Sequence, residues 1–173
     1  SIRADGNEIH GITGHFAYMP QNDLLFPWKT ILDNVCLYGE IHGSLARARE
    51  EALKNFPAFG LTGYENSYPS ALSGGMRQRA AFLRTALCQA DILLLDEPCS
   101  ALDMKNTIAI EETLMELKGQ YTFVIVTHNL GQAKRIADQI IFMDQGKILE
   151  VTDKETFFDS PATELAREQI QYM

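Results

Sequence analysis

The chain has 173 residues, of which 46% are hydrophobic and 22% are charged. These ordinary globular values exclude collagen-like, coiled-coil and intrinsically disordered classes, and the length suits one domain with a buried core. Fifteen Lys and Arg residues against twenty-three Asp and Glu residues leave a net charge of -8. This charge argues against a nucleic-acid partner or an anionic lipid surface, because both call for a broad basic patch.

The cysteines and the apolar runs indicate the cellular compartment in which the chain is expected to work. Cys36, Cys88 and Cys99 form no Cys-x-x-Cys pair, so we expect neither a zinc site nor a disulfide framework, and a reducing cytosol is the simplest environment. The most apolar run, residues 92–95, is far shorter than the roughly 18 residues that span a bilayer. A membrane would therefore be reached through a partner.

Hydrophobic periodicity and turn residues predict strands and helices that alternate along the chain. Strands are expected at residues 16–19, 92–96, 122–127, 140–143 and 148–151. Helices are expected at residues 44–59, 73–90, 107–117 and 131–137, with Ser44 as an N-cap and short helices after residue 151, one of them starting at Pro161. The run at 92–96 is typical of a parallel strand covered on both faces, and Gly146-Lys147 of a hairpin turn. This alternation predicts an α/β fold with a largely parallel sheet.

Two adjacent acids, Asp96 and Glu97, follow the apolar run Ile-Leu-Leu-Leu. Open α/β sheets place their ligands at the carboxyl ends of such strands. One acid there can hold Mg²⁺ through water, and its neighbour can orient or deprotonate an attacking water. A strand that merely ends in a charged turn explains this run alone equally well.

The segment Leu-Ser-Gly-Gly-Met-Arg-Gln-Arg at residues 72–79 precedes the acids. Gly74 and Gly75 at a helix start expose backbone N–H groups, Ser73 adds a hydroxyl, and the helix dipole favours an anion there. Taken alone, Ser-Gly-Gly is also an ordinary helix cap.

Together, LSGGMRQR and ILLLDEPCSALD resemble the ATP-binding subunits of ABC transporters, from about Gly6 to Glu150. The resemblance implies a P-loop NTPase (RecA-like) core with a mostly parallel sheet and an inserted helical subdomain. Residues 1–21 and 86–151 would form part of the core, residues 22–85 the helical signature subdomain, and residues 152–173 a C-terminal helical tail.

The resemblance also implies roles for single residues, with ATP and Mg²⁺ as cofactors. Glu97 would polarise the attacking water, His128 would contact the γ-phosphate, and Gln21 would act as the Q-loop glutamine. Asp96 and Gln21 would hold Mg²⁺ through water. The signature residues Ser73, Gly74, Gly75 and Gln78 would bind nucleotide held by a partner, and Asp103, in the D-loop at residues 100–103, would cross the dimer seam.

The P-loop of that family, GxxxxGK followed by Ser or Thr, does not occur in these 173 residues. Gly6 and Gly11 have the right spacing but are followed by Ile12-Thr13. Since Gln21 also lies near the start, we expect a chain truncated at its amino terminus, which binds ATP weakly or not at all and is inactive on its own.

Partners follow from the same resemblance. We expect a homodimer or a paired ABC ATPase subunit, a transmembrane permease and, indirectly, a solute-binding protein, which places the chain in the cytoplasm on the inner face of the membrane. Leu25, Phe26 and Trp28, beside Leu24 and Pro27, would contact the permease, because Trp is enriched at binding hot spots. Ordinary subdomain core is the alternative for each of them.

The transported solute stays open. The first half of the chain resembles importers of nitrate, sulfonates, taurine and thiamine pyrimidine precursors, and the second half resembles phosphate importers. The first group commonly continues after the D-loop with a Thr-Arg pair, where this chain has Met104-Lys105-Asn106-Thr107. Two other functions are kept: a non-catalytic ABC-type module that pairs with an intact subunit, and a non-transport ABC ATPase.

Overall fold

A computed structural model describes residues 3–4, 7–8, 14–100 and 102–173. The chain divides into two compact units, which meet in the sequence between Val126 and Thr127. Near the amino terminus, β1 (Arg3–Ala4) and β2 (Asn7–Glu8) pair antiparallel. The Gly6 and Gly11 pair and the D-loop residue Ala101 lie outside the described residues.

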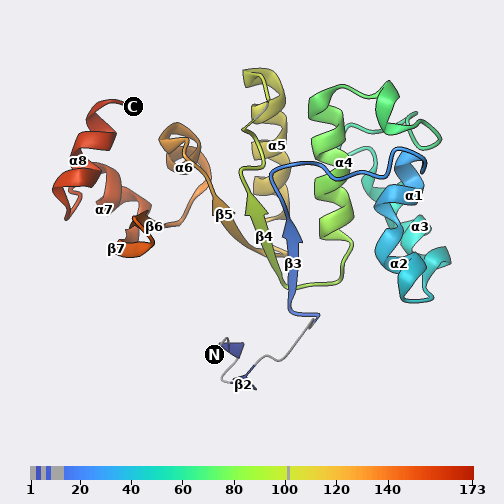
Figure 1. The fold of residues 1–173 in the computed structure, drawn as a ribbon, viewed down its shortest axis with the longest axis horizontal. Coiled ribbons are helices and arrows are strands. Elements are labelled where there is room, and N and C mark those ends of the chain that lie inside the picture. The colour runs from blue at the N-terminus through green and yellow to red at the C-terminus, as the bar shows by residue number, and fades with distance from the viewer. Residues whose placement is uncertain (1–2, 5–6, 9–13, 101) are drawn as a thin grey trace. The chain divides into compact units, whose positions relative to one another are not determined.

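The first unit is built on a parallel sheet of β3 (Phe16–Met19), β4 (Ile92–Asp96) and β5 (Thr122–Val126), in the order β3-β4-β5 (Figure 1). Phe16 lies opposite Ile92, and Ile92 opposite Thr122. The three strands therefore end at one edge. The α/β class and the parallel sheet are confirmed.

One face of this sheet is covered and the other is open among the described residues. On the covered face Ala17, Leu93 and Leu95 are almost fully buried, and helix α4 (Gly74–Ala86) contacts β3. On the other face Tyr18 is 59% and Val126 is 54% exposed. The prediction of a strand covered on both faces is therefore wrong here, because helices from the described segments pack on one side only.

Aromatic side chains join α4 to the sheet and to the small helices. The Phe82 ring lies edge-on to Phe59, with centroids 5.3 Å apart, and to Phe123 of β5 at 6.1 Å. Edge-to-face pairs of this kind add to the stabilisation from burial alone. The helices around α4 are α1 (Ile31–Val35), α2 (Leu37–Ile41), α3 (Leu45–Asn55) and the 3-10 turn η1 (Pro69–Ala71).

Two predicted helices end earlier than expected. Helix α3 follows Ser44 as predicted but ends at Asn55, because Pro57 has no N–H to continue the ladder and Gly60 turns the chain at φ +61°. Helix α4 ends at Ala86 rather than at residue 90, and the chain turns at Gln89, whose φ is +54°. Helix α5 (Met104–Leu117) instead starts three residues earlier than predicted, since Asp103 caps it.

The second unit contains α6 (Leu130–Ile136), β6 (Gln139–Asp144), β7 (Lys147–Asp153), α7 (Lys154–Asp159) and α8 (Glu164–Gln171). Strands β6 and β7 form the expected hairpin, whose turn has positive φ at Gln145 and Gly146. A small core gathers Phe142, Phe157 and Ala166. Pro161 does not start a helix: Thr163 caps α8.

No helix in the described part of the chain is both long and apolar enough to cross a membrane.

Candidate functional site

The carboxyl edge of the parallel sheet places two of the predicted site segments side by side. Gln21 follows β3, and Asp96 with Glu97 ends β4. The Tyr18 hydroxyl donates a hydrogen bond of 2.9 Å to Asp96 Oδ2. This bond to the carboxylate raises the pKa of Tyr18, since ionising the phenol would set two negative charges together. No motif in the sequence had pointed to Tyr18 as a partner of Asp96.

Glu97 stands in an unusual backbone conformation. Its φ is +48°, in the left-handed region that non-glycine residues seldom adopt. Its N–H donates to the carbonyl of Val126 at 2.9 Å, which extends the contact between β4 and β5 past the end of β4. Conformations of this kind concentrate at functional sites, where the surrounding structure enforces them.

Gln21 connects the predicted Q-loop to the predicted D-loop and the predicted signature. Its Nε2 donates to Ser100 Oγ, in the segment predicted as D-loop, at 3.3 Å. Its backbone carbonyl accepts a bond of 3.3 Å from Nε2 of Gln78, in the predicted signature. Three segments far apart in the sequence thus meet at Gln21.

The predicted signature opens α4. Ser73 is the N-cap, and its Oγ accepts a bond of 3.3 Å from the N–H of Met76. The capping alternative is therefore present, yet a hydroxyl keeps its own proton for a further acceptor. Ser73 and Gly74 are exposed, whereas Gly75 is buried. The first turn can thus present backbone N–H groups to an anion.

Two other predicted site residues, Asp103 and His128, are exposed. Asp103 is exposed and caps α5 through a bond from the N–H of Asn106. His128 is exposed and belongs to the second unit, which leaves its predicted contact with a γ-phosphate untested. Within the described residues no three His, Cys, Asp or Glu side chains gather into a metal-binding group.

Comparison with known proteins identifies the family. The model of the ABC transporter family matches residues 1–100. A formylaminopyrimidine import ATP-binding protein, ThiZ, from Halalkalibacterium halodurans is 46% identical over 136 residues, which cover 76% of this chain and 55% of that protein. The chain belongs to the ABC transporter ATP-binding family.

Two further relatives agree with this assignment. The glutamate/aspartate import ATP-binding protein GltL of Escherichia coli is 40% identical over 148 residues, which cover 83% of this chain and 61% of that protein. The arginine transport ATP-binding protein ArtM of Bacillus subtilis is 40% identical over 151 residues, with coverages of 85% and 62%. The chain thus spans 55% to 62% of the length of these three relatives.

In this ABC chain, two arginines of α4 form hydrogen bonds to the segment at residues 23–24, just after Gln21. Arg77 Nε lies 3.0 Å from Asp23 Oδ2. Arg84, seven residues later and so on the same face of the helix, donates to the carbonyls of Asp23 and Leu24, both at 2.8 Å. Sequence reasoning missed these contacts, and the seven-residue spacing was the only signal for them.

The residues predicted to contact a permease differ in how far their side chains are exposed. Trp28 is 70% exposed, and its ring lies 5.1 Å from that of Phe26. Leu25 is only 8% exposed, which favours the alternative of subdomain core over a permease contact for this residue. Leu24 is 61% exposed and takes its place on the surface.

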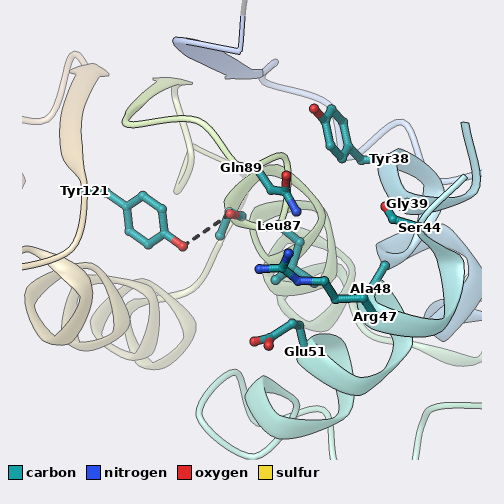
Figure 2. A pocket seen from close by; sticks show the side chains of 10 residues that line it. Tyr38, Gly39, Ser44, Arg47, Ala48, Glu51, Leu87, Gln89 and Tyr121 are labelled. Carbon is teal, nitrogen blue, oxygen red and sulfur yellow. Dashed lines mark hydrogen bonds between the residues drawn. The ribbon is translucent and has the colours of Figure 1, made fainter. Parts of the chain in front are cut away.

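A cavity of about 160 Å³ lies at the other end of α4 from the signature (Figure 2). Its lining includes Tyr38, Arg47 and Tyr121, and the Tyr121 hydroxyl donates to the carbonyl of Ala86, which ends α4. A helix of 13 residues is about 20 Å long, so this cavity is separate from the motifs of the ABC family.

Proposed function

We propose that the chain is part of the ATP-hydrolysing subunit that energises an ABC importer for a small solute. The observation that carries the proposal is Gln21, whose side chain and backbone bond the D-loop residue Ser100 and the signature residue Gln78. Family membership and relatives named as import or transport ATP-binding proteins support it.

Under this proposal the acids at the end of β4 divide the chemistry. Glu97 polarises the attacking water, and Asp96 with the side-chain oxygen of Gln21 would hold Mg²⁺ through water. Mg²⁺, when bound with ATP, would neutralise charge on the phosphates. His128 steadies the transferred γ-phosphate. On a partner's nucleotide, Ser73, Gly74, Gly75 and Gln78 act through hydroxyl, backbone and amide donors.

The proposed partners are a second ABC ATPase subunit, met at Asp103, and a membrane permease, met at Phe26 and Trp28, with a solute-binding protein beyond it. The chain then works in the cytoplasm, at the inner face of the membrane. The cargo is specified only as a small solute. A fold does not identify a cargo, and none of the site residues is proposed to contact one. The likeness to ThiZ, a formylaminopyrimidine import ATP-binding protein, supports formylaminopyrimidine as the first cargo to test.

The test joins this chain to a P-loop segment and follows ATP turnover. Glu97→Gln should keep nucleotide binding and stall hydrolysis. Glu112→Gln, the same change on an exposed residue of α5, is the matched control and should leave turnover unchanged. Normal turnover in the Glu97 variant would remove this residue from the proposed role.

A second candidate is a non-catalytic module that presents its signature to an intact subunit, since Ser73 and Gly74 at the start of α4 are exposed. Calorimetry of the chain alone with ATP and Mg²⁺ should show weak binding or none. If the chain alone binds ATP tightly, the phosphates are held by groups other than a P-loop, and the module role loses its support.

A further inference from the structure

We propose that Asn106 is a positioning residue that fixes the D-loop carboxylate of Asp103 and the first turn of the signature helix in one arrangement. Asn106 is half-buried and lies in the first turn of α5, three residues after Asp103. Its bearing on ATP turnover rests on the function proposed above, whereas the structural link itself does not.

Asn106 holds both oxygens of the Asp103 carboxylate. Its backbone N–H donates to Oδ1 at 2.9 Å, and its side-chain Nδ2 donates to Oδ2 at 2.9 Å. Asp103 is exposed, so these bonds, rather than burial, set the direction in which the carboxylate points. The same two bonds lower the pKa of Asp103, because they favour its charged form.

The other end of the Asn106 amide contacts the signature helix. Its Oδ1 accepts a bond of 3.0 Å from Nη1 of Arg79, one turn after Gly75. A Cβ added to Gly75 would lie 2.5 Å from both Cγ and Oδ1 of Asn106. Only a glycine lets the amide lie directly against the backbone of the first turn of α4.

An amide is the group that suits this place, because it donates and accepts at once. Asp at position 106 would set a second carboxylate against Asp103, and Leu, of similar size, would make neither bond. Since a packed contact and three hydrogen bonds connect them, a partner that displaces Asp103 also displaces the turn that begins with Ser73. The two segments proposed to meet the partner subunit would therefore respond as one.

The test compares Asn106→Leu with the unaltered chain by nuclear magnetic resonance. The Asp103 pKa should rise toward its ordinary value. The N–H groups of Met76 and Arg77, which bond to Oγ and O of Ser73, should exchange about tenfold faster, the equivalent of about 1.4 kcal/mol. Thr113→Val is the control: it removes a 2.9 Å bond to the carbonyl of Ala109 in the same helix and should change neither quantity.

A double variant, Asp103→Asn with Asn106→Asp, exchanges the two side chains. This double variant keeps an amide beside a carboxylate and an acceptor for Arg79, so the N–H groups of Met76 and Arg77 should again exchange slowly. If Asn106→Leu does not fold, the double variant alone tests the proposal. Unchanged exchange in Asn106→Leu would mean that Asn106 only supports the Asp103 cap of α5, and it would overturn the proposal. Fast exchange in the double variant would overturn it too. Neither measurement involves ATP, so either proposal can fail without the other.

Discussion

The buried amide of Asn34 shapes the turn that presents Trp28, and its removal gives a quantitative test. Asn34 is fully buried; its Oδ1 accepts from the N–H of Phe26 at 2.7 Å, and its Nδ2 lies 3.0 to 3.1 Å from the carbonyls of Phe26, Lys29 and Thr30. In Asn34→Ala the carbonyls of Phe26 and Thr30 keep bonds from the N–H groups of Lys29 and Asn34. The Phe26 N–H and the Lys29 carbonyl lose theirs.

Two backbone groups of half-buried residues left without these bonds, at about 1 to 1.5 kcal/mol each, predict a loss of about 2 to 3 kcal/mol in the free energy of unfolding. Urea unfolding followed by the fluorescence of Trp28, the single tryptophan, measures this loss. The anisotropy of Trp28 should also fall as the turn loosens. Asn55→Ala, which removes one bond to the carbonyl of Glu51, should cost about 1 kcal/mol or less. Equal losses in the two variants would refute the reasoning.

Three other predictions concern burial and charge. Leu25→Ala should lower the free energy of unfolding by about 3 kcal/mol. Trp28 is 70% exposed, so Trp28→Ala should change the free energy of unfolding by no more than about 0.5 kcal/mol. Similar melting temperatures for the two variants would contradict this prediction. Asp96→Asn should lower the pKa of Tyr18 toward its ordinary value of 10.0, because the hydrogen-bonded carboxylate raises it. Nuclear magnetic resonance can follow this titration, and an unchanged Tyr18 pKa in the variant would exclude the bond. Burial raises the pKa of Cys36 to about 11, so Cys36 should resist maleimide labelling at neutral pH until the chain unfolds, and rapid labelling of the folded chain would argue against it.

The parallel sheet could be predicted because its strands are short apolar runs between helical patterns. The run at residues 92–96 became β4 with the predicted bounds. Whether both of its faces are covered could not be predicted, since an apolar run looks the same whether or not a second layer of helices is present. The alternation of buried Leu93 and Leu95 with partly exposed Leu94 appears only once the neighbouring helices are placed.

The motifs of the site could be found by their residues, but their contacts could not. The bonds of Gln21 reach Ser100 and Gln78, which are 79 and 57 residues away, and no local pattern encodes such a distance. The start of α5 was missed for a different reason: Asp103 is a regular N-cap, but it was interpreted only as a site residue. The burial of Leu25 could not be decided from the sequence, because its direction depends on the turn that Asn34 holds.

The left-handed backbone conformation of Glu97 lowers the stability of the fold at a residue that the proposed chemistry requires. At φ +48° a residue with a side chain costs about 1 kcal/mol or more, whereas glycine adopts such angles freely. Glu97→Gly should therefore relieve this backbone cost while it removes the carboxylate. If a descendant of this chain no longer needed the proposed hydrolysis, the backbone cost would favour replacement of this acid by glycine before the buried residues of the sheet change.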